Sequence, residues 1–160
     1  MSRTITVSLP VADLKASKAF YTALGFVNNP QFSGDTAALM AWSESISVML
    51  LTHETWRTLT SRPIPPKTSS EVALNVSCDS REEVDAMNNA ASEHGGAADI
   101  NPVEDDVFMY GRDFADPDGH VWGAKWMDMS AMPCGESPPA TGPTENSNVM
   151  PTSKVPRGEP

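Results

Sequence analysis

The sequence predicts an α+β fold in which a βαβββ unit occurs twice within one domain. An alternating strand pattern appears over residues 4–9 and again over residues 71–76. Each is followed by a helical pattern and then by further strand patterns in the same order, at a spacing of roughly 65 to 70 residues. A Pro-rich segment, residues 61–70, separates the two copies and is not compatible with regular structure.

The first unit covers residues 3–60 and opens with the alternating strand at residues 4–9. Asp13 stands directly before the helical pattern, where a helix N-cap is expected. Gly25 follows that pattern and is the expected helix end, because glycine tolerates positive φ there. Between residues 26 and 52 we expect one weak strand and then two stronger strands joined as a hairpin.

The second unit covers residues 71–128 and repeats this order. Ser80 and Glu83 form a capping-box pattern at the start of the predicted helix. A weak strand and a closing hairpin follow, the hairpin spanning residues 107–127. Sequence identity between the two units is slight, so the duplication is one of order and spacing.

Composition narrows the possible functions. The chain has 160 residues, 39% of them hydrophobic, and a net charge of −10. With no basic stripe to neutralise phosphates, nucleic acid is not an expected partner. No apolar run approaches the ~20 residues that cross a bilayer, and the N-terminus lacks signal-peptide features. The two cysteines, Cys78 and Cys134, argue against a disulfide framework, and we expect a cytoplasmic protein.

These patterns predict a single domain over residues 1–132, made of unit one (3–60), the Pro-rich linker (61–70) and unit two (71–128). Residues 133–160 contain seven of the 14 prolines and few large apolar residues. Such a segment buries too little surface to offset its chain entropy, so we predict a disordered tail. A docking peptide within the tail is the alternative.

Two motifs carry a resemblance to a known family. The opening motif reads Leu-Pro-Val-Ala-Asp-Leu-Lys-Ala-Ser at residues 9–17, with Phe-Tyr at 20–21 and Leu-Gly-Phe at 24–26. The closing motif reads Asp-Pro-Asp-Gly-His-Val-Trp at residues 116–122. Together they resemble the vicinal oxygen chelate superfamily of glyoxalases, extradiol dioxygenases, fosfomycin-resistance enzymes and bleomycin-binding proteins. Three further segments look most like bacterial predicted lactoylglutathione lyases: residues 48–52, 80–84 and 126–128.

The resemblance implies that the two units curl their mixed sheets around a central groove, with the helices outside. It also implies that metal-dependent members hold a divalent ion with residues from the first and last strands of each unit. Carried over one at a time, those positions fall on Thr6, Leu50, Glu71 and Gly123. Counting back from Asp79 instead would place the third on Val72.

This donor set does not suit a divalent ion. Leucine and glycine offer no side-chain ligand, and threonine is a poor one. We therefore expect no metal and no other cofactor. A divalent metal held by Glu71 together with His53 or His120 is the alternative, although both histidines lie at strand ends and are also explained as surface residues.

Strand alternation also predicts which side chains line the groove. The lining is small and mixed in polarity, which is typical of a binding cavity. The candidate ligand-binding residues are Thr6, Ser8, Val48, Leu50, Glu71, Ala73, Asn75, Gly123 and Lys125. Glu71 and Lys125 are the ionisable pair among them, and Glu71 is the candidate catalytic base or ligand anchor. An ordinary ion pair at the groove rim is the alternative.

We therefore expect metal-independent binding of a small molecule in the groove. The missing metal donors and the mixed lining favour it, and the acidic charge would attract a cationic ligand. A metal-dependent lactoylglutathione lyase-like lyase or isomerase, or a dioxygenase, with a rebuilt metal site is the alternative, so whether the chain is an enzyme stays open. A third hypothesis is an interaction module that uses the tail. The sequence also leaves a homodimer open.

Overall fold

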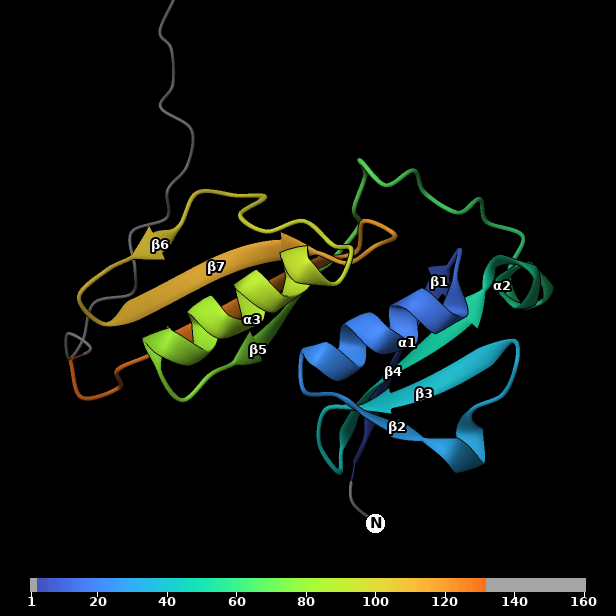
Figure 1. Ribbon diagram of the computed structural model, residues 1–160, viewed down its shortest axis with the longest axis horizontal. Coiled ribbons are helices and arrows are strands. Elements are labelled where there is room, and N and C mark those ends of the chain that lie inside the picture. Colours follow the sequence, from blue (N-terminus) through green and yellow to red (C-terminus); the bar gives the residue numbers. More distant parts are fainter. Residues whose placement is uncertain (1–2, 132–160) are drawn as a thin grey trace, which may run out of the picture.

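The duplication predicted from the sequence is confirmed. The computed structural model describes residues 3–131, so the predicted disorder of residues 133–160 lies outside the described residues. The first unit contains β1 (Ile5–Val11), α1 (Leu14–Ala23), β2 (Val27–Asn29), the short 3₁₀ helix η1 (Pro30–Phe32), β3 (Ala37–Ala41), β4 (Ile46–Thr52) and α2 (His53–Leu59). The second contains β5 (Ala73–Ser77), α3 (Arg81–Glu93), β6 (Glu104–Asp105), β7 (Met109–Ala115) and β8 (Val121–Met127) (Figure 1).

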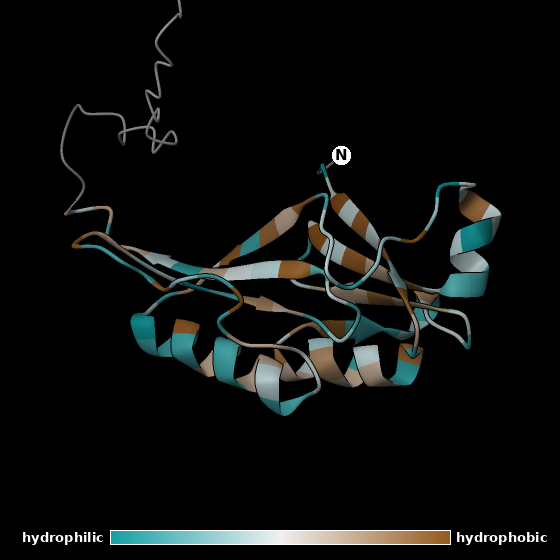
Figure 2. Ribbon diagram, turned by 90° about the horizontal axis from the view of Figure 1, so that it is seen from above, coloured by the Kyte–Doolittle hydropathy of each residue, from teal (hydrophilic) through white to brown (hydrophobic). Residues whose placement is uncertain are grey.

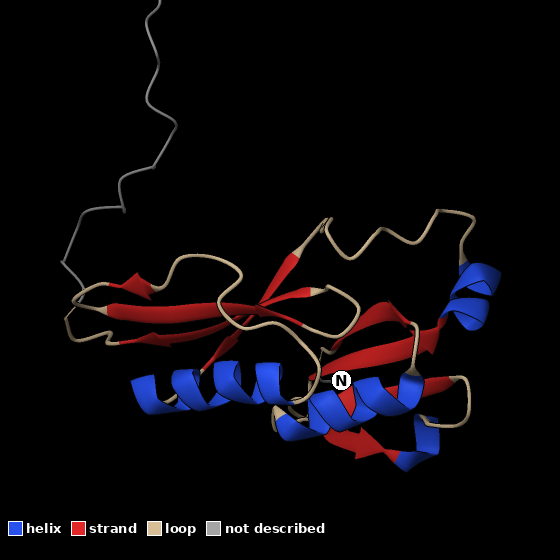
Figure 3. Cartoon of the chain, turned by 45° about the horizontal axis from the view of Figure 1, so that its top comes forward, coloured by secondary structure: helices blue, strands red, loops and turns tan. Residues whose placement is uncertain are grey.

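Each unit forms a four-stranded mixed sheet of the same topology. The strand orders are β1-β4-β3-β2 and β5-β8-β7-β6. In each sheet the first strand runs parallel to the last, and the other neighbours are antiparallel. A connection without regular structure, residues 60–72, arches from α2 to β5 (Figure 3). Its prolines cannot donate to a strand ladder, which explains why the repeat is interrupted there.

The helices lie on one side of the molecule. Figure 2 shows α1 and α3 beneath both sheets, while α2 lies off the end of β4. Within residues 3–131 no helix covers the opposite face of the sheets. This arrangement matches the predicted curled mixed sheet with helices outside. Each helix in the same part of the chain is too short or too polar to span a lipid bilayer.

The helix boundaries follow the predicted signals. The Asp13 carboxylate accepts a hydrogen bond from the Ala16 N–H at 2.9 Å, and the Ser80 hydroxyl accepts one from the Glu83 N–H at 3.2 Å. Each bond satisfies a backbone donor that a helix start leaves without a partner. Gly25 ends α1 with a φ of 97°, a conformation that residues other than glycine rarely adopt.

One buried hydrogen-bond chain joins the two units. Tyr21, fully buried on α1, donates its hydroxyl to the Asp116 carboxylate at 2.8 Å and accepts a hydrogen bond from the Trp122 indole at 3.1 Å. Asp116 also accepts hydrogen bonds from the backbone N–H groups of Asp118 and His120, which close the turn before β8. Burial raises the pKa of Tyr21 and of Asp116 above their ordinary values. The closing motif is therefore part of the core that packs α1 against β8.

The strand register corrects two expected side-chain orientations. Val48 and Leu50 were expected on the open face of the sheet, but they are 1% and 0% exposed and point to its core side, where Val48 also lines a cavity between β1 and β5. β4 pairs in parallel with β1, which places Val48 beside Val7 and Leu50 beside Leu9. Paired residues of neighbouring strands point to the same side of a sheet. Leu50 therefore lies in the core together with Leu9.

Candidate functional site

The face of the two sheets away from α1 and α3 holds most of the candidate ligand-binding residues. We name it the groove face. Along its four central strands it is defined by Thr6, Ser8, Ser47, Met49, Ala73, Asn75, Ser77, Val121, Gly123 and Lys125, which alternate with buried core positions. Six of the nine predicted groove residues lie on it: Thr6, Ser8, Ala73, Asn75, Gly123 and Lys125. The Thr6 and Ser47 hydroxyls lie 2.9 Å apart, so its β1–β4 side is polar.

Glu71, the candidate catalytic residue, is not brought to Lys125. It lies two residues before β5 begins and is exposed. Lys125 pairs with Ser77 at the far end of β5. At about 3.3 Å per residue, the six residues from Glu71 to Ser77 span roughly 20 Å. The alternative interpretation, an ion pair between Glu71 and Lys125, is therefore wrong, because the two residues lie at opposite ends of β5.

Lys125 is instead held by two carboxylates on neighbouring strands. Its ammonium donates to Asp113 Oδ1 at 2.8 Å and to Glu104 Oε2 at 2.6 Å, and its side chain is 15% exposed. Asn101 donates to the second Asp113 oxygen at 2.8 Å. Burial lowers the pKa of Lys125, but the hydrogen bonds to Asp113 and Glu104 outweigh that effect and the pKa is raised. Lys125 is therefore a charged ammonium at neutral pH and not a nucleophile or base.

Two glycines make room for this ion pair. A Cβ built on Gly123 would overlap Asn75 Oδ1 and lie 2.7 Å from Asp113 Oδ1 and 2.9 Å from Lys125 Cε. A Cβ built on Gly111 would lie 2.5 Å from Lys125 Cδ. Real Cβ atoms do not come this close to other heavy atoms. A side chain at Gly111 would therefore displace Lys125, and one at Gly123 would displace Asn75 and Asp113 as well as Lys125.

Sequence reasoning placed Lys125 in the groove but missed its partners, Asp113 and Glu104. The register puts Glu104 beside Gly111 and Gly111 beside Lys125, so the three residues form one row across β6, β7 and β8. An acid and a base that flank a glycine in one row can meet over it. The signal was present, but it becomes visible only once the register of three strands is known.

A second polar cluster fixes the segment that carries Asn101 and Glu104. The Arg112 guanidinium donates twice to Asp99, at 2.9 and 2.7 Å, and once to Asp85 on α3, at 2.8 Å. Asn88, which is fully buried on α3, donates to Asp99 at 3.2 Å. Bidentate pairing of this kind fixes orientation as well as distance. The pKa of Asp85 and that of Asp99 both lie below the ordinary value, chiefly because of the hydrogen bonds from Arg112.

This cluster leads to a pH-dependent expectation. In the unfolded chain these two carboxylates have their ordinary pKa and bind protons at a higher pH than in the folded protein. Their contribution to stability is therefore present above about pH 4 and is lost as the pH falls further. We expect Arg112→Gln to lower the free energy of unfolding at pH 7, and the difference from wild type to shrink by pH 3. Urea unfolding at both pH values measures it, with Arg62→Gln in the exposed linker as the control. A difference that grows on acidification would contradict this assignment.

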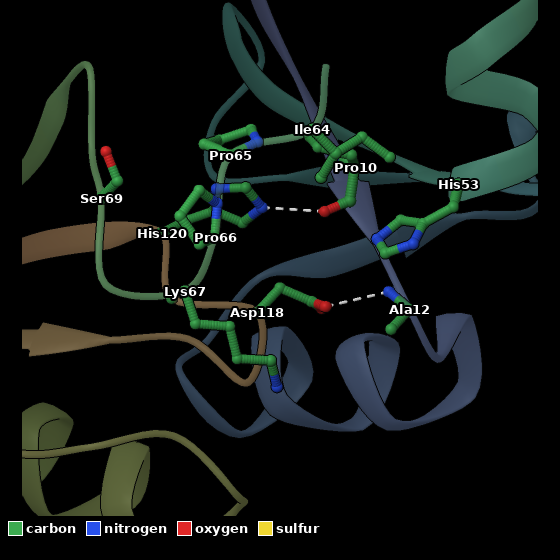
Figure 4. A pocket seen from close by; sticks show the side chains of 11 residues that line it. Pro10, Ala12, His53, Ile64, Pro65, Pro66, Lys67, Ser69, Asp118 and His120 are labelled. Carbon is green, nitrogen blue, oxygen red and sulfur yellow. Dashed lines mark hydrogen bonds between the residues drawn. The ribbon is translucent and has the colours of Figure 1, made fainter.

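His53 and His120 lie together at a separate cavity of about 150 Å³ under the linker (Figure 4). The His120 Nε2–H donates to the Pro10 carbonyl at 2.9 Å. Asp118, also in the wall, accepts a hydrogen bond from the Ala12 N–H at 2.9 Å. Glu71 does not line this cavity. The wall of this cavity therefore does not bring Glu71 together with the two histidines.

Two βαβββ units, each with a four-stranded mixed sheet of the same topology, make up the fold of the described chain. Residues 4–123 match the model of the Glyoxalase/Bleomycin resistance protein/Dioxygenase superfamily. The chain belongs to this family. No curated protein matches it significantly.

Several solved structures share the fold. A hypothetical protein, SA1046 from S. aureus, is 28% identical, with a TM-score of 0.66 over 79% of this chain and 95% of that one. A family enzyme from Burkholderia phytofirmans PsJN is 18% identical, with a TM-score of 0.66 over 79% and 100%. TnmS3, an antibiotic binding protein from Streptomyces sp. CB03234, is 26% identical, with a TM-score of 0.54 over 80% and 98%.

The structure allows the implied metal positions to be compared between the units. Thr6 lies seven residues before the N-cap of α1, and Ala73 lies seven residues before the N-cap of α3. Pro10 and Ser77, each three residues before its cap, pair with Leu51 and Lys125. Met49 and Gly123 lie two residues before Leu51 and Lys125, on β4 and β8 respectively. Symmetry between the two units therefore aligns Thr6 with Ala73 and Met49 with Gly123, so Met49 and Ala73 would take the places that the resemblance gave to Leu50 and Glu71.

These residues do not fit a divalent metal. One threonine hydroxyl and one thioether among the four are a poor donor set, because Zn²⁺ takes His, Cys or carboxylate ligands and harder ions take several oxygens. The Thr6 hydroxyl already lies at hydrogen-bonding distance from Ser47. Across residues 3–131, no three or more His, Cys, Asp and Glu residues are grouped so that they could hold a metal ion.

Proposed function

We propose that this protein binds a small molecule on the groove face without the help of a metal ion. The observation that carries the proposal is the Lys125–Asp113–Glu104 ion pair over Gly123. The family resemblance places the fourth metal donor at Gly123, and the side chain of Lys125 lies beside that position. The Lys125 ammonium occupies the carboxylate oxygens of Asp113 and Glu104 that a divalent ion would need as ligands.

The charge of the groove favours neutral or cationic ligands. Lys125 contributes one positive charge against two negative charges from Asp113 and Glu104, and the whole chain carries −10. An acidic protein raises the local concentration of cations near its surface. The structural similarity to TnmS3, an antibiotic binding protein, agrees with a binding function.

Two finer points belong to the same proposal. We propose a homodimer, since Ile5, Ile46 and Val72 leave apolar side chains exposed to water in the single chain and a second copy would cover them. We propose a cytoplasmic location, which the presence of only two cysteines supports.

Thermal unfolding tests the metal-independent function. We expect Zn²⁺, Ni²⁺ or Mn²⁺ alone to leave the Tm of the full chain unchanged, since a ligand raises Tm only if the folded state binds it. Compounds from a library of cationic and neutral drug-like molecules should raise the Tm equally with EDTA and with divalent ions. The proposal is wrong if the divalent ion alone raises Tm by several degrees, or if stabilisation by a compound vanishes in EDTA.

A further inference from the structure

A second cavity lies at the seam where the two sheets meet. It has a volume of about 220 Å³ and lies between β1 and β5. Both strands stand at the edge of their sheets, with β4 and β8 as their respective neighbours. Ile5 and Val7 line it from β1, and Asn75 and Ser77 line it from β5. We name it the seam cavity.

Aromatic rings form one wall of the seam cavity. Phe26 packs between Trp42 and Trp122, with ring centroids 5.0 and 5.6 Å away. The indole N–H of Trp122 is already donated to Tyr21, so Trp122 offers the cavity an apolar ring. Flat aromatic walls favour a ligand that is itself planar, through offset or edge-to-face contact.

The polarity of the rim and the uncharged residues of the lining restrict the class of ligand further. Ile5 is 63% exposed and Ile46 is 46% exposed, so the rim presents apolar surface to water. Each residue that lines the cavity in the described chain is uncharged. A charged group buried there would lose its hydration without gaining a counterion, which is unfavourable. The lining therefore suits a neutral molecule.

We propose that the seam cavity binds a neutral, planar molecule of about two fused rings that carries a hydroxyl or carbonyl oxygen. An apolar cavity of ~150 Å³ holds benzene, so the larger volume here suits a bicyclic ring system. The rings would lie against Trp42 and Trp122, and the oxygen would meet the amide of Asn75 or the hydroxyl of Ser77 at the mouth. This inference rests on the proposed small-molecule binding and names its ligand class.

The test uses 2-naphthol as the probe and the full-length protein. We expect saturable binding, measured by quenching of tryptophan fluorescence and by calorimetry. Naphthalene-2-sulfonate, which has the same rings and a charged head, should bind at least roughly tenfold more weakly because of its desolvation. Equal affinity for the two probes, or no saturable binding of 2-naphthol, would overturn the proposal.

A cavity-filling variant locates the site. Val7→Phe adds a ring from β1 into the seam cavity and should weaken 2-naphthol binding by at least roughly tenfold, since it fills the space that the probe occupies. Val107→Phe, the same change at a position that is 86% exposed and outside the cavity lining, should leave the affinity unchanged. If Val7→Phe fails to fold, Asn75→Ala on the exposed mouth replaces it and should weaken 2-naphthol binding more than naphthalene binding.

The outcomes separate the two proposals. Unchanged 2-naphthol affinity in Val7→Phe, or an equal loss for both probes in Asn75→Ala, would overturn the seam cavity and leave groove-face binding standing. If binding required a divalent ion but the contrast between Val7→Phe and Val107→Phe persisted, the metal-independent function would be overturned and the seam cavity would stand.

Discussion

Replacing Asp116 with alanine is expected to lower the free energy of unfolding by roughly 3 to 5 kcal/mol. The Asp116 carboxylate is 3% exposed and accepts hydrogen bonds from Tyr21 and from two backbone N–H groups of the closing turn. Alanine would leave those donors without a partner, and a buried donor left unpaired costs about 1 to 3 kcal/mol. Urea unfolding at pH 7 measures the loss.

Two tyrosine variants provide a matched comparison for that network. Tyr21 and Tyr110 each donate a hydroxyl to an aspartate at 2.8 Å, but Tyr21 is fully buried whereas the acceptor of Tyr110, Asp85, is 45% exposed. We expect Tyr21→Phe to cost about 1 to 3 kcal/mol and Tyr110→Phe less than about 1, because water can replace the exposed bond. Equal losses at both positions would show that the buried chain does not join the units as described.

Replacing Gly123 with glutamate is expected to destabilise the protein by roughly 2 to 4 kcal/mol and to create no metal site. The new Cβ would overlap the Asn75 amide, and the carboxylate would stand beside Asp113. Gly123 does not have a positive φ. The loss of stability would therefore come from steric overlap and from repulsion between carboxylates, and not from backbone strain. Denaturant unfolding measures the loss, and metal analysis of the variant measures binding.

Gly34 offers the matched control, because a Cβ built there meets no atom within 4 Å. Gly34→Glu should change the free energy of unfolding by less than about 0.5 kcal/mol. A Gly123→Glu protein that is as stable as Gly34→Glu, or that retains a stoichiometric divalent ion, would contradict the role assigned to the ion pair.

Much of the fold was predictable because its signals are local. Asp13, Ser80 and Gly25 act on backbone groups within a few residues of themselves, so their roles could be inferred without knowing any partner strand. The repeat of the strand and helix order was visible for the same reason. The number of units and the position of the linker needed no long-range information.

The candidate site was less predictable because it depends on register between strands. Parity within β4 gives two possible faces for Leu50, and only its pairing with Leu9 decides between them. Glu71 was placed in a strand by alternation, whereas β5 begins at Ala73. The partners of Lys125 come from β6 and β7, and a residue pattern within β8 carries no information about them. The sequence pattern contains no information about contacts between segments that are far apart along the chain.

The metal content of the full-length protein, purified without chelators, tests the central claim most directly. With Lys125, Asp113 and Glu104 closed over Gly123, we predict well under one equivalent of Zn, Ni, Mn or Fe per chain by elemental mass spectrometry. About one equivalent in the wild-type protein, lost on Thr6→Ala or Glu71→Ala, would contradict the account, because a metal site needs donors of that kind.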